Sequence, residues 1–215
     1  MYLPSSFEER DSERLRSFIR EHPFGTLVTL TTTGLDANHI PFLLLADPTS
    51  AAATLHGHIA RANPLWRDLV PDSLVLVIFH GPESFISPSW YASTRETAKA
   101  VPTWNYAVVH AHGALRVVDD VTWLRSHVEA LTQEHERPRE TPWAIGDAPA
   151  DFVDTLLGGI IGIEISVTRL TGKWKVSQNR SGADRAGVVE GLEREGLKSG
   201  IEMAALVKAT FGDPT

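Results

Sequence analysis

The chain has 215 residues, of which 42% are hydrophobic and 22% are charged, and this balance excludes a disordered, collagen-like or low-complexity protein. Its 27 acidic residues outnumber its 20 basic residues, and the net charge of −7 disfavours a dedicated nucleic-acid-binding protein. Because the sequence contains no cysteine, disulfides, thiolate metal sites and cysteine nucleophiles are excluded. With neither a secretory-signal pattern at residues 1–10 nor an apolar run of about 18 residues, we expect a cytoplasmic protein with no membrane-spanning helix.

The first predicted element is a helix that ends at His22-Pro23. Ser6 and Glu9 fit a capping box at its start, and Asp11 is an alternative N-cap. The apolar residues of one helical face are Leu15, Phe18 and Ile19.

Four strands follow in the sequence. Thr33-Gly34-Leu35 predicts a hairpin turn between the first two strands, and Asp47-Pro48 predicts a turn before the third. Asn63-Pro64 predicts the start of a short helix before the fourth strand, whose unbroken apolar run is typical of a central strand covered on both faces. The predicted strands cover residues 24–31, 38–45, 53–57 and 74–79.

The second half of the chain predicts two further strands and several helices. Apolar and polar residues alternate in both strands, as expected where one face of a sheet is buried. The predicted elements are a loop-rich segment at 81–103, a strand at 105–118, a helix capped by Asp119 or Asp120, a helix at 148–157, a strand at 161–168, a turn at 170–172, and a weakly helical, mostly surface segment at 184–209.

This order of elements predicts an α+β, mainly β fold. Strands joined by short turns favour an antiparallel sheet, closed or nearly closed, with peripheral helices. We expect a single domain over residues 1–215, with a helical C-terminal segment from about residue 181. A parallel βαβ arrangement is disfavoured because long helices do not separate the strands and no G-x-G-x-x-G fingerprint precedes a helix.

Three clusters of residues are candidates for a functional site. In the first, Arg61 stands next to the Asn63-Pro64 helix start, so a cationic fork and free backbone N–H groups together predict an anion site, a phosphate in particular. The alternative is a surface arginine beside a structural helix cap.

The second cluster interleaves aromatic rings with hydroxyl, amide and lysine groups between Ser87 and Tyr106. Such a set suits a flat, polar cofactor that carries a phosphate, and the alternative is aromatic packing at a barrel corner. The third cluster, Gly172 to Arg180, places many hydrogen-bond donors around Trp174. It is interpreted as a segment that closes a site or binds a phosphate, and the alternative is a solvated turn with one buried tryptophan.

Two His-x-His pairs, His56/His58 and His110/His112, have strand spacing, so each pair points to one face. A metal site of the cupin kind needs a glutamate a few residues further on, and neither pair has one. We therefore expect structural or cofactor-lining histidines and no metal site.

The clusters resemble the PaiB family, described as FMN-binding negative transcriptional regulators. The resemblance runs from about Met1 to Gly191. In place of the proline and lysine expected after Trp90-Tyr91, this sequence has Ala92-Ser93-Thr94-Arg95, so the cation at that place is open. The strings that carry the resemblance are His22-Pro23-Phe24, Gly57 to Pro64, Ile86 to Tyr91, Val101-Pro102-Thr103-Trp104-Asn105-Tyr106, and Lys173-Trp174-Lys175 with Ser177-Gln178-Asn179-Arg180.

The resemblance implies a homodimeric split β-barrel of the pyridoxamine-phosphate-oxidase-like kind, with FMN at the subunit interface. The phosphate is expected to meet Arg61 and the helix start, with Lys99, Ser87 and Ser89 as further contacts. Trp104 is expected to stack on the ring and Asn105 to bond its polar edge, while Gln178 and Arg180 come from the partner. The full predicted set is Arg61, Asn63, Ser87, Ser89, Trp90, Lys99, Thr103, Trp104, Asn105, Trp174, Gln178 and Arg180.

The expected function is that of an FMN-binding homodimer with a flavin- or redox-linked role in negative regulation of transcription. Two alternatives stay open: a flavin-dependent oxidoreductase acting on a small molecule, and a haem-binding split-barrel protein. Whether the protein is an enzyme is left open, and direct DNA binding is disfavoured by the net charge.

Overall fold

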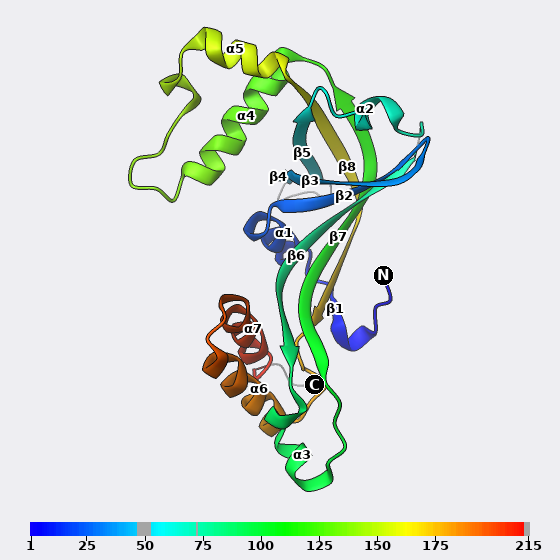
Figure 1. Ribbon diagram of the computed structural model, residues 1–215, viewed down its shortest axis with the longest axis vertical. Helices are drawn as coiled ribbons and strands as arrows, with labels where there is room; N and C mark the ends of the chain where they lie inside the picture. The colour runs from blue at the N-terminus through cyan, green and yellow to red at the C-terminus, as the bar shows by residue number, and fades with distance from the viewer. Residues whose placement is uncertain (47–52, 72, 213–215) are drawn as a thin grey trace. The chain divides into compact units, whose positions relative to one another are not determined.

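The computed structural model describes residues 1–46, 53–71 and 73–212. Within them, eight strands form one antiparallel sheet in the order β3-β2-β6-β7-β8-β5-β4, with β1 paired to β8 (Figure 1). The strands are β1 Glu8–Glu9, β2 Phe24–Thr31, β3 Gly34–Pro41, β4 Leu43–Ala46, β5 Ala53–Ala60, β6 Leu74–Ile86, β7 Thr103–Val118 and β8 Ile160–Lys175.

Seven helices of the described residues accompany the sheet. In that part of the chain, none combines the length and the hydropathy that crossing a membrane requires. The helices are α1 Ser12–Glu21, α2 Leu65–Asp68, α3 Ala92–Thr97, α4 Val121–Glu136, α5 Ala150–Gly158, α6 Gly182–Glu195 and α7 Lys198–Ala209, and short 3₁₀ turns cover Ser5–Phe7, Pro88–Trp90 and Ile145–Asp147.

The chain divides into two compact units, each made of segments distant in sequence. The first unit comprises Met1–Leu15, His80–Val109 and Thr171–Thr215, and the second comprises Arg16–Phe79 and His110–Leu170. Strands β6, β7 and β8 have residues in both units. The expectation of one domain over the whole chain stays a prediction.

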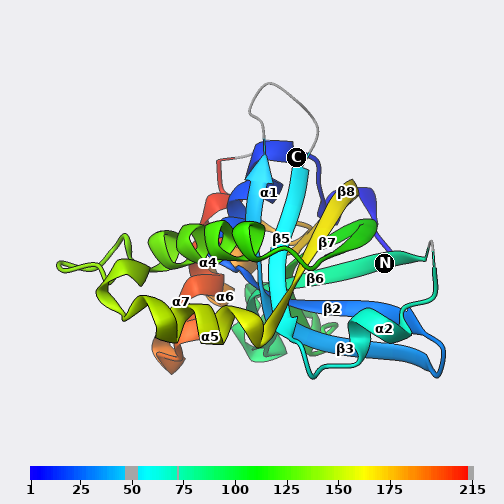
Figure 2. The ribbon, with the colours of Figure 1, turned by 90° about the horizontal axis from the view of Figure 1, so that it is seen from above.

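The second unit is built on strand alternation. Along β2 and β5 every other side chain is buried, as a sheet with one covered face requires. Gly34 adopts a φ of +121° in the β2–β3 turn, which a residue without a Cβ tolerates. In Figure 2, α4 and α5 run beside each other, and they share a core of Leu124, Ile145, Val153 and Leu157.

The first unit contains the C-terminal helix pair. Helices α6 and α7 lie together in Figure 1, and their facing apolar residues are buried. The expectation of a helical, mostly surface segment at 184–209 agrees with these helices, because most of their residues are accessible. Apolar residues on the facing sides are buried where one helix packs on the other. They include Val188, Leu192, Met203 and Val207.

Several boundaries differ from the predicted ones. Asp11, and not the Ser6–Glu9 capping box, caps α1, because its Oδ1 accepts from the backbone N–H groups of Glu13 and Arg14. The predicted strand at 38–45 is two strands: β3 pairs with β2 and β4 pairs with β5, so the chain changes neighbours at Phe42. The predicted turn at Asp47-Pro48 lies outside the described residues.

Strands β6 and β8 are longer than the strands predicted from the sequence. The predicted turn at 170–172 does not occur, because β8 continues to Lys175 and pairs with β1 at Gly172 and Lys173. Strand β6 likewise runs to Ile86, into the segment predicted as loop. Its residues 74–79 alternate between buried and accessible, so β6 is a central strand without full cover on both faces. Of the two candidate caps of α4, Asp120 is the one used: its Oδ1 accepts from Trp123 N at 2.7 Å.

Candidate functional site

A cationic cluster lies in the first unit, where the end of β8 meets the start of β7. Lys175 Nζ donates to Thr103 Oγ1 at 2.5 Å and to the backbone oxygen of Trp104 at 2.6 Å. Burial, and then the positive charges of Lys173 and Arg180, lower the pKa of Lys175 below its usual value. A bound anion would relieve this repulsion, so the cluster favours a negatively charged ligand.

Asn105 and Ser177 form the buried support of this cluster. Asn105 Nδ2 donates to Ser177 Oγ at 2.8 Å, and the two residues are 1% and 4% exposed. Ser177 has a φ of +64°, in the left-handed region that most residues avoid. The hydrogen bond therefore holds the chain in the turn that leads from Lys175 toward Arg180.

An exposed aromatic surface adjoins the cationic cluster. Trp104 is 53% exposed, and its ring meets that of Phe85 edge to face at a centroid distance of 6.1 Å. Trp174, in contrast, is buried, with the Arg14 guanidinium 5.5 Å from its ring centroid. Of these two predicted tryptophans, Trp104 is the one that offers an open face for stacking.

The amide of Gln178 organises the loop after β8. Its Nε2 donates to the backbone oxygens of Trp174 at 2.5 Å and Ser6 at 2.9 Å, and its Oε1 accepts from Val176 N at 2.8 Å. The Arg180 guanidinium lies 4.6 Å from the ring centroid of Tyr91. Gln178 thus has a structural role within its own chain.

The remaining predicted residues of the first unit surround the Pro88–Trp90 turn. Ser87 Oγ and Ser89 Oγ lie 2.7 Å apart. Trp90 packs on α6 so closely that a Cβ added at Gly191 would come within 2.3 Å of its ring. Lys99 is exposed. The side chain of Arg95 lies outside the described residues.

Arg61 and Asn63 belong to the second unit. Arg61 Nη1 and Nη2 donate to Asp119 at 2.9 and 2.6 Å, and its Nε and Nη2 donate to the backbone oxygens of Gly158 and Ile160. Asn63 donates to Asn38 and accepts from Leu65 N, as expected of the cap of α2. Four of the five guanidinium N–H donors therefore already contact protein oxygens. These contacts favour a structural role for Arg61, and its predicted phosphate role is untested.

Ten of the twelve predicted residues thus lie in the first unit. The predicted set omitted Lys173, Lys175 and Ser177 of this cluster, because the predicted turn at 170–172 hid the continuation of β8 to Lys175. Continued strand alternation of Lys173, Trp174 and Lys175 is the signal that would have shown it.

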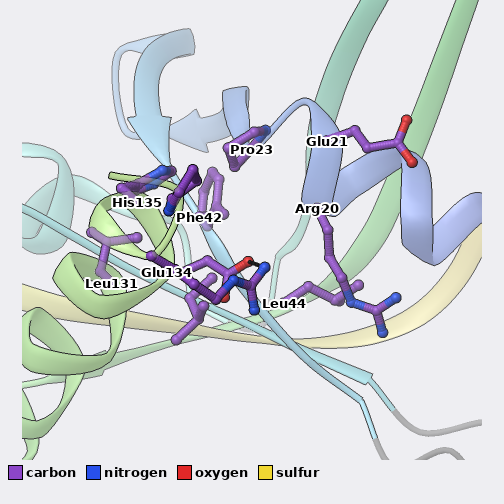
Figure 3. A pocket seen from close by; sticks show the side chains of 11 residues that line it. Arg20, Glu21, Pro23, Phe42, Leu44, Leu131, Glu134 and His135 are labelled. Carbon is purple, nitrogen blue, oxygen red and sulfur yellow. Dashed lines mark hydrogen bonds and ion pairs between the residues drawn. The ribbon is translucent and has the colours of Figure 1, made fainter. Parts of the chain in front are cut away.

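Cavities of the first unit border this set. One of about 250 Å³ is lined by Trp174, Gln178 and Arg185, and another of about 410 Å³ is lined by Ser89 and Trp90. A cavity of about 480 Å³ in the second unit is lined by apolar side chains, among them Phe42, Leu44 and Leu131, and by charged ones such as Arg20, Glu21 and Glu134 (Figure 3). None of its lining residues belongs to the predicted set.

The two His-x-His pairs have different surroundings. His56 and His58 approach His127 of α4, which sequence reasoning did not connect with them because it lies 69 residues further along the chain than His58. His110 and His112 have ring centroids 6.4 Å apart on β7. In the described residues, no group of three or more His, Asp or Glu side chains has the arrangement to hold a metal ion.

Known proteins resemble this chain over most of its length. Residues 1–169 match the family model described as "Putative FMN-binding domain". A protein of Emericella nidulans is 35% identical over 97% of this chain and 96% of its own. Protease synthase and sporulation protein PAI 2 of Bacillus subtilis is 33% identical over 97% of each chain.

A solved structure shares the fold. The FAD and haem binding protein of Mycobacterium smegmatis superposes with a TM-score of 0.56 at 16% identity, covering 78% of this chain and 73% of that protein. The antiparallel sheet is of the split-barrel class, and the chain belongs to the PaiB family of FMN-binding-domain proteins.

Proposed function

We propose that the chain binds FMN as a homodimer, at the first-unit cluster of Lys175, Thr103 and Trp104, and acts as a flavin-linked negative regulator of transcription. The observation that carries the flavin assignment is a partly buried ammonium group, with two further cations beside it, next to an exposed indole. FMN carries a phosphate dianion and a planar ring, and the donor set suits both parts.

The phosphate is assigned to the cations of the first unit. Lys173, Lys175 and Arg180 repel one another, and an anion converts that repulsion into attraction. Lys99 and the hydroxyls of Ser87 and Ser89 supply further donors. We leave Arg61 and Asn63 out of the proposed contacts because their polar groups already bind protein atoms in the second unit.

The ring is assigned to Trp104, with Phe85 supporting the indole from its edge. Asn105 has its amide in the bond to Ser177, so we assign it the task of holding the β7 strand in place under Trp104. A bound flavin supplies reversible transfer of electrons and hydride. The protein's residues bind its phosphate, orient its ring and limit the access of water to it.

The homodimer is supported by exposed apolar side chains. In the first unit, Phe85, Trp104 and Val101 are 45%, 53% and 70% exposed. In the second unit, a paired set of sheet residues is exposed as well: Leu30 lies opposite Leu35 in the β2–β3 hairpin. Patches of this kind mark interfaces, and a second copy would cover them. Because the amide of Gln178 is bound within its own chain and Arg180 belongs to the phosphate cluster, we leave their predicted contacts with a partner's flavin out of the proposal.

The regulatory role is drawn from the likeness to the PaiB family, whose Bacillus subtilis relative is named for protease synthesis and sporulation. The Mycobacterium smegmatis structure is named as an FAD and haem binding protein, and haem binding is one of the two alternatives. The other alternative is a flavin-dependent oxidoreductase. A redox-active flavin serves a regulator as a sensor and an oxidoreductase as a reactant, so the cofactor alone does not separate them.

The cofactor assignment is tested by titrating FMN into the protein and following the quenching of flavin fluorescence. We expect Lys175→Gln and Trp104→Ala each to weaken binding roughly tenfold to a hundredfold, since a lost charge-assisted hydrogen bond or aromatic contact is worth about 1–3 kcal/mol. Lys198→Gln is the matched control, because this lysine is 92% exposed on α7. Equal affinity of all variants would reject the site.

The regulatory assignment is tested on the FMN-loaded protein. We expect retention of a specific genomic fragment that survives competition by random duplex, with no steady oxidation of NADH or NADPH. Turnover of a reduced nicotinamide without any fragment bound would assign the protein to the oxidoreductases instead.

A further inference from the structure

Three histidines join α4 to β5 inside the second unit. His58 Nδ1 lies 3.1 Å from His127 Nε2, and His56 Nε2 lies 3.2 Å from Glu164 on β8. Trp123 covers the group: its ring stacks on His127 at 5.2 Å and 20° and meets that of His56 at 4.8 Å. The contact between this helix and the sheet is therefore made in part through titratable rings.

The hydrogen bonding of His127 shows which protonation state the structure needs. His127 is 3% exposed, and its Nδ1 has no hydrogen-bond partner among the described residues. We assign the proton to Nε2, which donates to His58, because a bare lone pair at Nδ1 costs less in an apolar setting than an unpaired N–H. Protonation of His127 would add such an unpaired N–H together with a charge.

The helices α4 and α5 have the means to move as a unit. Leu124 of α4 and Val153 and Leu157 of α5 share one core, against which Ile160 of β8 also packs, and Arg125 of α4 pairs with Asp154 of α5. Against the sheet, the Trp123 ring packs directly on Gly162 of β8, where an added Cβ would lie 2.4 Å from it. The helix pair keeps its internal contacts if this face separates.

The charges around the cluster set the direction of the pH effect. Burial lowers the pKa of His56, of His58 and, to about 3, of His127. Glu164 from β8 opposes this shift for His56, Arg116 from β7 adds to it, and His56 and His58 repel a charge on His127. An opened state with ordinary histidine pKa values near 6.5 therefore takes up protons first as the pH falls.

We propose that His56, His58 and His127 form a pH-sensitive latch, which holds the α4–α5 helix pair on the sheet at neutral pH and releases it in mild acid. The latch engages while all three rings are neutral. Below pH 6.5 the released state binds more protons, so opening is favoured increasingly with acidification. For His127 alone, a pKa of about 3 in the closed state raises the opening constant roughly 30-fold between pH 7.5 and pH 5.

Hydrogen exchange of the full chain, corrected for the intrinsic pH dependence of exchange, measures this release. We expect peptides from α4 and α5 to exchange at least tenfold faster at pH 5 than at pH 7.5, while peptides from α6 and α7 keep their protection. In His127→Phe, which keeps an aromatic ring but cannot be protonated, the acid response in α4–α5 is reduced by the share of His127, and the contributions of His56 and His58 remain.

His135→Phe is the matched control, because His135 is an exposed residue of the same helix and its replacement should leave the acid response intact. His58→Phe provides a second variant of the cluster if His127→Phe does not fold, and its response should also be reduced. The proposal is overturned if the acid response is equal in the cluster variants and the control, if α6–α7 loosen together with α4–α5, or if nothing loosens down to pH 5.

Discussion

Asn105 of β7 and Ser177, two residues beyond the end of β8, are joined by a buried hydrogen bond of 2.8 Å. The two residues lie 72 positions apart, and the bond fixes a non-glycine residue with a φ of +64°. A residue in this region of φ and ψ persists only where its surroundings hold it there. The turn that carries the cluster around Lys175 therefore depends on this buried polar pair.

Asn105→Ala is expected to lower the free energy of unfolding by about 1–3 kcal/mol, because Ser177 then lacks its buried partner. Urea denaturation measures the change. A double-mutant cycle with Ser177→Ala should give a coupling energy of about 1 kcal/mol, and a coupling near zero would show that the pair does not stabilise the turn.

The Asn105–Ser177 pair also shows where prediction from sequence ends. Asn105 entered the predicted set through a string of residues that resembles a known family, and alternation correctly placed it on a strand. The sequence gives no signal that its partner is Ser177, because that contact depends on β8 continuing to Lys175. The turn predicted at 170–172 would have separated the two strands.

Local sequence patterns predict where a strand or helix lies better than they predict which other element it contacts. The strand at 24–31 and the cap at Asn63 follow from alternation and helix-capping chemistry, and both are observed. The exchange of partners at Phe42 and the approach of His127 to His58 are long-range events. No local pattern shows which strand a segment pairs with or which distant residue a side chain contacts. These two features were therefore visible only in the structure.

Arg61 is expected to act as a structural strap. Arg61→Ala should lower the melting temperature, because it removes contacts to Asp119 and to two backbone oxygens, while FMN affinity should change less than about twofold, well below the loss of a charge-assisted contact. Thermal melts paired with flavin titration measure both, with Arg139→Ala as the exposed control. A tenfold loss of affinity with an unchanged melting temperature would place Arg61 at the phosphate.

The oligomeric state is expected to be a dimer. Two chains of 23.6 kDa give about 47 kDa, and light scattering should report this mass at micromolar concentration. The reason is that a second chain would bury the apolar side chains that are exposed in one chain. A mass of about 24 kDa would show that those surfaces face solvent in solution and that no partner chain completes the flavin site.

Tight binding to random DNA is not expected. A dimer carries a formal charge of about −14, twice the −7 of one chain, and repels the phosphates of a duplex. Fluorescence anisotropy with a random duplex at physiological salt should show a Kd above one micromolar. Submicromolar binding would reveal a concentrated basic surface that outweighs the net charge.

The central claim is that the chain binds a flavin mononucleotide, and equilibrium dialysis of the protein against FMN, FAD and haemin, read by the absorption spectrum, tests it most directly. We predict that the protein retains one FMN per chain with shifted flavin bands and retains FAD more weakly. Lys175→Gln should retain less FMN than the parent protein. A protein that retains haemin with a Soret band, or that retains no flavin at all, would contradict the assignment.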